Sequence, residues 1–291
     1  MKNILLLGEN GFVGNVVLQI LQAESNLFLL PEKTKIDSDS IKDVIQNIRA
    51  IISNNKVDVV VNCIAKANLD ECESEKESCR LINTTFVKQL VELLLECKDV
   101  KLVHVSSNAV YDGEHAPYSE ESPCYPINYY GQCKLESDEY IADNLENYAI
   151  ARPITVYGPK KEGQRDNPVS FIIRKLMDGD SLTLVDDNIV NMIHVSDLSA
   201  AIKKLALENY RGLYNLSGDV SECRYDLGYR VARLIGVSED KITKVDGKSF
   251  KMAASRPKDT SFDNSKMKAL LGIKPKNIDE KILEIVSCGE Y

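Results

Sequence analysis

The sequence predicts an α/β fold, a doubly wound parallel sheet followed by a smaller mixed α/β lobe. Three observations predict it. Short apolar runs alternate with longer amphipathic stretches over the first 155 residues. These runs are continuously apolar, which is typical of strands that are buried on both faces of a sheet. A glycine-rich turn joins the first run to the first helical stretch, and strands separated by helices form βαβ units with right-handed crossovers.

The expected elements of the sheet follow in order along the chain. Apolar runs predict strands at 3–7, 27–30, 57–61, 102–105 and 149–151. Apolar residues spaced three and four apart predict the intervening helices, at 13–23, 41–52 and 81–95.

The pattern loosens after about residue 158, where a polar turn occupies 158–163. Shorter helix and strand candidates follow, at 169–177, 182–185, 198–206, 227–235 and 267–271. We therefore expect the sheet domain to span 1–158, with later segments able to return to it. A mainly substrate-binding lobe is expected over 159–291.

Composition and charge exclude several classes of protein. Apolar residues make up 44% of the 291 residues and charged residues 27%, as in an ordinary globular protein. With 36 basic and 44 acidic residues the net charge is -8, and no basic patch for nucleic acid stands out. No apolar stretch is long enough to span a membrane. The eight cysteines form no C-x-x-C pair, so we expect free thiols in the reducing cytoplasm and no metal site.

A glycine turn lies between the first predicted strand and the first predicted helix, with the spacing G-x-x-G-x-x-G. Glycines at such positions permit a tight turn, let the backbone approach a pyrophosphate and pack a helix against a strand. The helix N-terminus adds free N–H groups and a partial positive charge. We therefore predict that the turn binds a dinucleotide, through Gly8, Asn10, Gly11, Phe12, Val13 and Gly14.

The type of dinucleotide depends on the segment after the second predicted strand. An acidic side chain there would bind the ribose 2′-hydroxyl of NAD, and Glu32 and Asp37 are candidates. Lys33 or Lys35 could instead bind the 2′-phosphate of NADP. A solvated loop with neither role is the alternative. The cofactor is left as NADP or NAD, with a slight preference for NADP.

A tyrosine and a lysine, Tyr130 and Lys134, stand four residues apart in a Y-x-x-x-K pattern. On a helix they share a face, and the lysine ammonium could lower the tyrosine pKa toward neutrality. A tyrosine with such a pKa can act as a general acid or base. Ser107 follows the predicted strand 102–105 and would reach the same edge of the sheet. His104 lies inside that strand, and we expect it to have a structural role.

In these features the chain resembles the extended short-chain dehydrogenase/reductase family, and most closely its dTDP-4-dehydrorhamnose reductase branch. The resemblance covers nearly the whole chain. It includes the glycine turn, Asn62-Cys63-Ile64-Ala65, Asn83, Ser106-Ser107, Tyr130 with Lys134, Arg152-Pro153, His194-Val195-Ser196-Asp197 and Arg256-Pro257 with Asp263. Asp70, Glu73 and the step Val110-Tyr111-Asp112-Gly113 are the features that point to the branch.

The resemblance implies a Rossmann domain, a nucleotide-activated keto sugar as substrate and reduction by NAD(P)H. Ser107 and Tyr130 would hold the keto oxygen, while Lys134 would bind the nicotinamide ribose. Further cofactor contacts are implied for Cys63, Ile64, Ala65 and Pro153, with Asn83 supporting the active-site helix. The family also implies a homodimer, formed through helices such as 90–95, although the apolar residues there could equally be core.

Substrate contacts are expected from Ser107, Asn108, Asn167, Asn191 and Arg256. A pyrophosphate needs cations, and Arg256 is the first candidate, with Arg165 or Arg174 second. The chain departs from the branch at Asn108 and Ala109, which replace an acid and an aromatic residue, and it has no tryptophan. These departures leave the sugar open. A nucleotide-sugar 4-epimerase and a non-catalytic dinucleotide-binding regulatory subunit are the alternatives.

Overall fold

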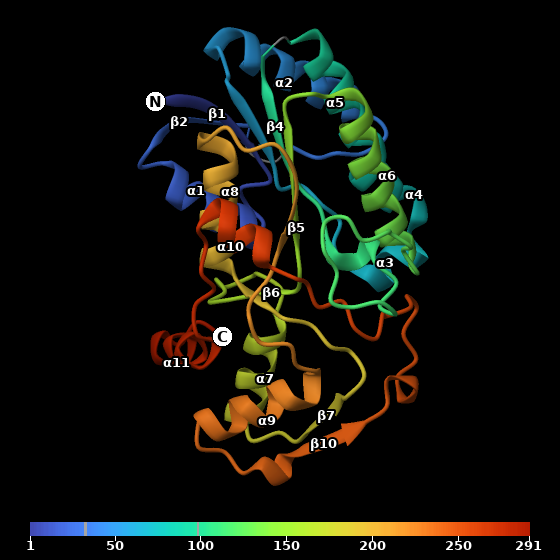
Figure 1. The fold of residues 1–291 in the computed structure, drawn as a ribbon, viewed down its shortest axis with the longest axis vertical. Coiled ribbons are helices and arrows are strands. Elements are labelled where there is room, and N and C mark those ends of the chain that lie inside the picture. Colours follow the sequence, from blue (N-terminus) through green and yellow to red (C-terminus); the bar gives the residue numbers. More distant parts are fainter. Residues whose placement is uncertain (32–33, 98) are drawn as a thin grey trace.

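The computed structural model describes residues 1–31, 34–97 and 99–291. Its centre is a parallel sheet of six strands in the order β2-β1-β3-β4-β5-β9 (Figure 1). The strands are β1 (Lys2–Leu7), β2 (Ser25–Leu29), β3 (Val59–Asn62), β4 (Lys101–Val105), β5 (Tyr148–Pro153) and β9 (Gly212–Leu216). The predicted doubly wound parallel sheet is confirmed.

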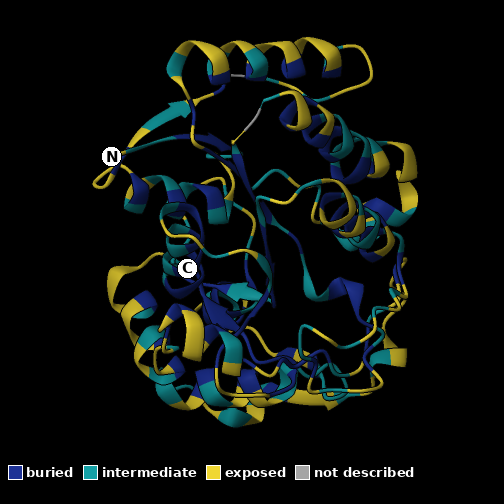
Figure 2. Cartoon of the chain, turned by 45° about the horizontal axis from the view of Figure 1, so that its top comes forward, coloured by how far each residue is buried: buried dark blue, intermediate teal, exposed yellow. Residues whose placement is uncertain are grey.

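Helices cover both faces of this sheet (Figure 1). One face carries α1 (Phe12–Leu21), α8 (Val195–Leu207) and α10 (Ser265–Leu271); the other carries α2 (Ile41–Asn55), α5 (Phe86–Glu96) and α6 (Tyr129–Asn144). Successive residues of a strand point to opposite faces. Ile4 and Leu6 therefore pack on the α1 side and Leu5 and Leu7 on the α2 side. This two-sided burial explains the continuously apolar runs, and Figure 2 shows the buried sheet between helices with exposed outer faces.

The helix predicted at 81–95 differs from a single regular helix. It begins with a wider, π-helical turn over Leu81–Thr85 and continues as α5. The backbone carbonyl of Asn83 in this turn accepts a hydrogen bond from the Ser137 hydroxyl of α6. Two short helices, α3 (Leu69–Ser74) and α4 (Lys76–Arg80), lead into the turn.

A second lobe lies beyond the carboxyl ends of the strands (Figure 1). It contains α7 (Pro168–Met177), α9 (Arg224–Leu234) and α11 (Ile278–Cys288), with a two-stranded parallel sheet of β7 (Leu182–Val185) and β10 (Ile242–Val245). A second small sheet, β6 (Val156–Tyr157) with β8 (Ile193–His194), joins the two halves. Short 3-10 turns lie at Asn108–Val110, Glu239–Lys241 and Gly247–Ser249.

The chain returns to the main sheet after its first excursion into the lobe. Helix α8 packs against α1, and β9 pairs in parallel with β5 at the edge of the sheet. Segment 195–216 therefore belongs to the sheet half although it follows the first lobe elements in sequence. Among the helices that the structure describes, none is long and apolar enough to cross a membrane.

Candidate active site

The candidate site lies where the strand order of the sheet reverses. Strand β1 pairs with β2 on one side and with β3 on the other, so the connections that leave β1 and β3 diverge. Ligands of open α/β sheets bind in the crevice at the carboxyl ends of strands at such a switch point. Gly8 follows β1 and Cys63 follows β3, and these two residues lie in contact there.

The glycine turn, residues 8–14, forms a cradle, a concave stretch of backbone that Cβ atoms at its glycine positions would fill. A Cβ on Gly14 would stand 2.0 Å from the Gly8 carbonyl oxygen, and one on Gly8 would stand 2.9 Å from the Cys63 carbonyl carbon. Gly8 also has a φ of +86°, which favours glycine. Helix α1 begins at Phe12 with no side-chain cap from Gly11, so its first N–H groups are available to an anion. The cradle fits the pyrophosphate of a dinucleotide.

A cavity of about 300 Å³ continues from this turn. It is lined by Gly8, Glu9, Asn10, Leu30, Pro31, Thr34, Ile36, Ile64, Ala65 and Ile82. These mostly apolar walls fit the adenosine half of a dinucleotide. Of the side chains expected to select NAD or NADP, Glu32 and Lys33 lie outside the described residues. Asp37 accepts the Ser40 and Asp39 backbone N–H groups, and hydrogen bonds from Ser40 lower its pKa.

Ser107, Tyr130 and Lys134 come together at the end of β4. Tyr130 and Lys134 lie on one face of α6, and both side chains are buried. Burial raises the pKa of Tyr130, although a hydrogen bond with Ser107 opposes this. In this structure burial instead raises that pKa, so the expectation that Lys134 lowers it toward neutrality is not met. The phenol stays protonated at neutral pH and can donate a proton.

The lysine has partners of its own. Lys134 Nζ donates to the Val105 carbonyl oxygen at 2.7 Å and lies 3.1 Å from His104 Nε2. Burial lowers the pKa of Lys134 to about 8. His104, which was expected to be structural, is thus in direct contact with this lysine.

A large cavity of about 720 Å³ opens beside Ser107 and extends into the second lobe. Sheet-domain residues Leu69, Ser107, Asn108 and Ala109 line one end. Lobe residues Arg224, Lys248, Phe250, Met252, Arg256 and Lys258 are among those that line the rest. Its size and its cationic side chains fit an elongated anionic substrate.

Comparison with known proteins identifies the family. The family described as the RmlD substrate binding domain matches residues 1–289. The chain belongs to this family. The expected resemblance to the dTDP-4-dehydrorhamnose reductase branch of the extended short-chain dehydrogenase/reductases is confirmed.

Relatives of this RmlD-family chain include a reductase and a methionine adenosyltransferase subunit. The dTDP-4-dehydrorhamnose reductase of Salmonella typhimurium is 27% identical over 278 residues, covering 91% of this chain and 90% of that protein. Methionine adenosyltransferase 2 subunit beta of Rattus norvegicus is 22% identical over 280 residues, covering 92% and 82%. In fold, the chain matches dTDP-4-dehydrorhamnose reductase of Bacillus anthracis in complex with NADP, with a TM-score of 0.85, 24% identity and 99% of both chains covered.

Two arginines that line the large cavity, Arg256 and Arg224, differ in whether a carboxylate neutralises their charge. Arg256 donates to Asp70 Oδ2 at 2.7 Å and to the Ala254 carbonyl at 2.9 Å, so its charge is compensated. Arg224, the first residue of α9, donates a hydrogen bond to the sulfur of Met192 at 3.4 Å and makes no ion pair with any residue that the structure describes. A partly buried cation without a carboxylate partner is a candidate for anion binding.

Sequence reasoning missed Arg224. Nothing local distinguishes it from the other arginines, because the difference lies in which of them meets a distant carboxylate. Arg174, the weaker candidate, is paired with Asp166 on the surface of α7.

The predicted asparagines have different surroundings. Asn108 lines the large cavity, and its amide donates to the Thr260 hydroxyl at 2.7 Å. Asn167 caps α7 and bonds the Gly158 carbonyl, while Asn191 bonds backbone groups of Gly218 and Phe262. Neither Asn167 nor Asn191 is among the residues that line the cavity.

Two further predicted residues, Asn83 and Pro153, lie next to the segments that form the site. The Asn83 amide accepts the Lys66 N–H at 3.1 Å and donates to the Lys66 carbonyl at 3.0 Å, which holds the segment that follows Ala65. Pro153 is buried at the carboxyl end of β5, beside Leu216 of β9.

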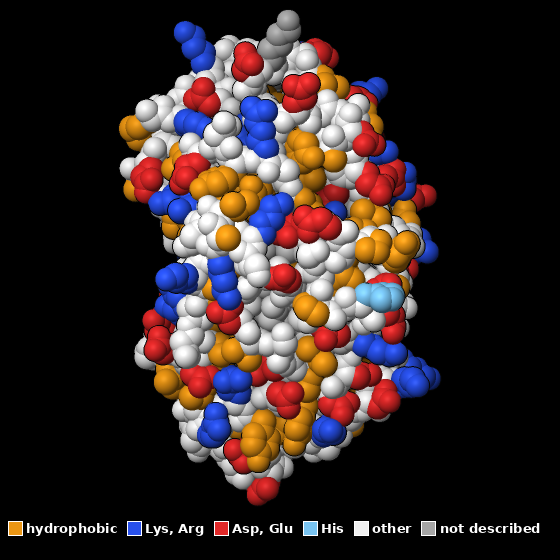
Figure 3. Space-filling view, viewed as in Figure 1, with side chains coloured by type: hydrophobic (Ala, Val, Ile, Leu, Met, Phe, Trp, Pro, Cys, Tyr) orange, Lys and Arg blue, Asp and Glu red, His pale blue; other side chains and the backbone are white. Residues whose placement is uncertain are grey.

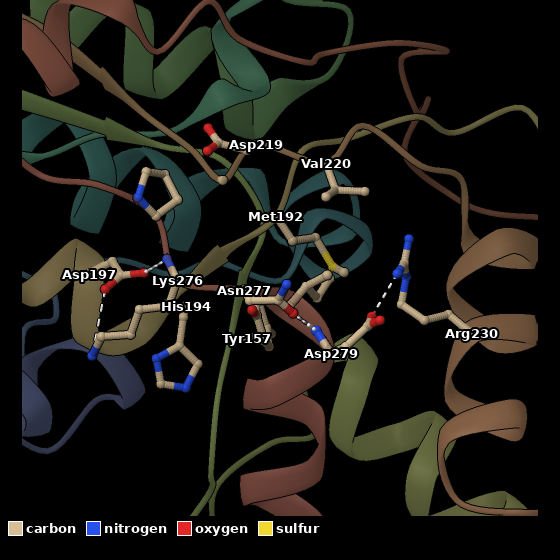
Figure 4. Close-up of a pocket in the computed structure, with 13 residues that line it drawn as sticks. Tyr157, Met192, His194, Asp197, Asp219, Val220, Arg230, Lys276, Asn277 and Asp279 are labelled. Carbon is tan, nitrogen blue, oxygen red and sulfur yellow. Dashed lines mark hydrogen bonds and ion pairs between the residues drawn. The ribbon is translucent and has the colours of Figure 1, made fainter.

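A separate cavity of about 300 Å³ lies between β8, α9 and α11 (Figure 4). Its charged groups have ion-pair partners: Lys276 bonds Asp197, Arg230 bonds Asp279, and Asp219 bonds Lys268 outside the cavity. It shares no lining residue with the cavity at Ser107. On the face drawn in Figure 3, acidic and basic side chains are likewise interspersed.

Proposed function

We propose that the protein is an NAD(P)H-dependent reductase of a nucleotide-activated keto sugar. The observation that carries this proposal is the position of Ser107, Tyr130 and Lys134. They lie at the carboxyl end of β4, next to the strands of the switch point, with a cradle for a dinucleotide at β1 and the 720 Å³ cavity beside Ser107. A pure binding protein has no need of a buried phenol at this place.

When bound, the cofactor would supply a hydride to the keto carbon. Tyr130 donates its proton to the oxygen that gains negative charge, since burial keeps the phenol protonated. Ser107 Oγ accepts the Ala109 N–H at 3.2 Å and donates to Asn108 Oδ1 at 3.4 Å. Its hydroxyl would turn from this long contact to donate to the same oxygen. Lys134 orients the nicotinamide ribose and takes part in replacing the proton that Tyr130 gives up.

The nucleotide end of the substrate is assigned to the lobe side of the cavity. Arg224 would bind the diphosphate, because its charge has no carboxylate partner among the described residues. Arg256 would contribute less, since Asp70 already neutralises it. Asn108 is placed to contact the sugar near Ser107.

The test is nicotinamide absorbance during incubation with NADPH, and then NADH, and a panel of nucleotide-linked 4-keto-6-deoxy sugars. We expect oxidation with at least one member of the panel, which would name the substrate and the cofactor together. Failure of every member, with cofactor binding demonstrated separately, would overturn the reductase proposal. A redox-neutral change of the sugar would instead indicate an epimerase.

A regulatory subunit is the second candidate, favoured by the likeness to methionine adenosyltransferase 2 subunit beta. A regulatory subunit would bind dinucleotide without turnover and would form a complex with a catalytic partner. Tyr130→Phe would then leave its function intact, whereas it should abolish the function of a reductase.

We also propose a homodimer that works in the cytoplasm. The free thiols support a reducing compartment. On α5, Val91 and Leu94 are covered within the single chain, whereas Leu95 is 51% exposed, so a dimer would use residues such as Leu95 instead. Light scattering on the purified protein gives the oligomeric state.

A further inference from the structure

His104 connects the catalytic lysine to the end of strand β3. Its ring is fully buried in β4, with Nε2 3.1 Å from Lys134 Nζ and Nδ1 3.2 Å from Asn62 Nδ2. The histidine therefore lies between an amide and an amine. Both groups can donate hydrogen bonds, and a neutral imidazole has a single N–H.

The direction of each hydrogen bond follows from the backbone. The Ile64 N–H donates to Asn62 Oδ1 at 3.1 Å, which fixes the amide with its Nδ2 toward His104. Asn62 Nδ2 donates, so His104 Nδ1 accepts and the ring proton lies on Nε2. That proton points at Lys134 Nζ, which can accept it only as an uncharged amine, because an ammonium has no lone pair.

The charges around the pair agree with this assignment. Burial holds the pKa of His104 well below its usual value, so the ring is neutral. Burial also lowers the pKa of Lys134 to about 8. Four nearby groups oppose this shift and raise the pKa: Asp138 and Cys133 on α6, Cys63 after β3 and Cys79 on α4. Asp138 is itself bound by Arg152 and Ser106.

We propose that His104, oriented by Asn62, is a positioning residue that donates a hydrogen bond to Lys134 and favours its uncharged amine. The proposal rests on the proposed reductase function. Each turnover would place a hydride on the keto carbon and one proton, through Tyr130, on its oxygen, and a solvent proton must then restore Tyr130. A lysine whose two forms are close in free energy near neutral pH can take up that proton and release it. If His104 Nε2 accepted a hydrogen bond from Lys134 instead, the ammonium form would be stabilised and Lys134 would release its proton less readily.

The first test needs no substrate. The chain has three histidines, His104, His115 and His194, so long-range ¹H–¹⁵N NMR can assign each ring. Exposed His115 is assigned by His115→Gln and His104 by His104→Gln. We expect His104 to stay neutral and to carry its proton on Nε2 above about pH 8, where Lys134 is an uncharged amine. A ring proton on Nδ1 in that range would overturn the proposal, whether or not the protein reduces a sugar.

The second test reverses the amide. Asn62→Asp keeps an oxygen for the Ile64 N–H but replaces the donor toward His104 by an acceptor. The ring proton should move to Nδ1 and Nε2 should accept from the Lys134 ammonium. With the substrate found above, the fall of kcat at alkaline pH should shift upward by about one pH unit. The tautomer of His104 in Asn62→Asp is read by NMR alongside the limb, because the new carboxylate also stabilises the Lys134 ammonium directly. A ring proton that stays on Nε2, or an alkaline limb that does not move, would contradict the proposal.

His115→Gln is the matched control and should leave the pH profile unchanged. If Asn62→Asp does not fold, the NMR of the wild-type protein still decides the tautomer. In that case His104→Gln, which retains a side-chain N–H donor, should keep the alkaline limb close to its wild-type position, whereas His104→Phe should move it to higher pH. No shift with His104→Phe would count against the proposal.

Discussion

Gly14 lies against Gly8 so closely that a Cβ on Gly14 would stand 2.0 Å from the Gly8 carbonyl oxygen. Gly14→Ala must therefore shift the backbone of the turn. We expect the Kd for NADPH to rise at least about tenfold, because N–H groups placed for the phosphates would be displaced. Gly11→Ala is the graded control, since its Cβ would stand 3.3 Å from the same oxygen. Calorimetric titration measures both, and an unchanged Kd for Gly14→Ala would contradict the assigned cradle.

Tyr130→Phe removes the proton donor while preserving the ring in the core. We expect kcat to fall by about a hundredfold or more, with the Kd for the cofactor close to wild type. Tyr125, which is 61% exposed, offers a matched control as Tyr125→Phe. Steady-state kinetics with the substrate from the panel would settle the point. Near-wild-type turnover would mean that another group supplies the proton.

Arg224 and Arg256 should differ in their effect on substrate binding. Arg224→Met removes an uncompensated cation from the cavity, so we expect KM for the nucleotide sugar to rise by about ten- to a hundredfold. Arg256→Met should have a smaller effect on KM, because Asp70 already holds that guanidinium. Arg174→Met, on the surface of α7, is the control. Equal effects of the two cavity arginines would argue against the assignment of the diphosphate to Arg224.

The buried ion pair of Asp138 and Arg152 should matter for stability. The Arg152 Nε bonds the carboxylate at 2.8 Å, and the two side chains are 3% and 6% exposed. Asp138→Leu leaves a buried guanidinium without its partner, which costs about 3–5 kcal/mol of unfolding free energy. Glu96→Leu breaks the exposed pair with Arg49 and should change the unfolding free energy far less, because solvent screens that pair. Urea unfolding followed by circular dichroism compares the two variants.

Mild acid should destabilise the fold through His194. Burial, with the charges of Lys281 and Lys276, lowers the His194 pKa to about 4, whereas an unfolded histidine titrates near about 6.5. Between these values the unfolded chain binds a proton that the folded chain does not. Stability therefore falls as the pH decreases through this window, by about 1.4 kcal/mol per pH unit from this residue.

His194→Asn keeps an acceptor for the Ser196 N–H at the start of α8. It should flatten the acid dependence measured by urea unfolding at pH 6.5, 5.5 and 4.5. His115→Gln, on an exposed loop, should not change the slope. A slope that is the same in His194→Asn and in the wild type would contradict this prediction.

Local patterns in the sequence were enough to predict the segments that form strands β1 to β5 and helices α1, α2 and α5, whereas strand β9 and helix α11 were not predicted. Strands buried on both faces must be apolar throughout, so 3–7, 57–61 and 102–105 could be recognised without any partner. The glycine turn and the spacing of Tyr130 and Lys134 are also local, because each depends only on the strand–turn–helix or the helix that contains it.

Only the tertiary structure decided how the charged and polar groups are used. Arg256 meets Asp70 across 186 residues, whereas Arg224 lines the same cavity without a carboxylate partner among the described residues. In the sequence, His104 has the pattern of an ordinary buried strand residue. Only the packing of α6 against β4 places Lys134 next to its ring. The physical reason is that burial periodicity is set by neighbours along the chain, whereas the pKa and the hydrogen-bond direction of a buried group are set by whichever distant side chain the packing places beside it.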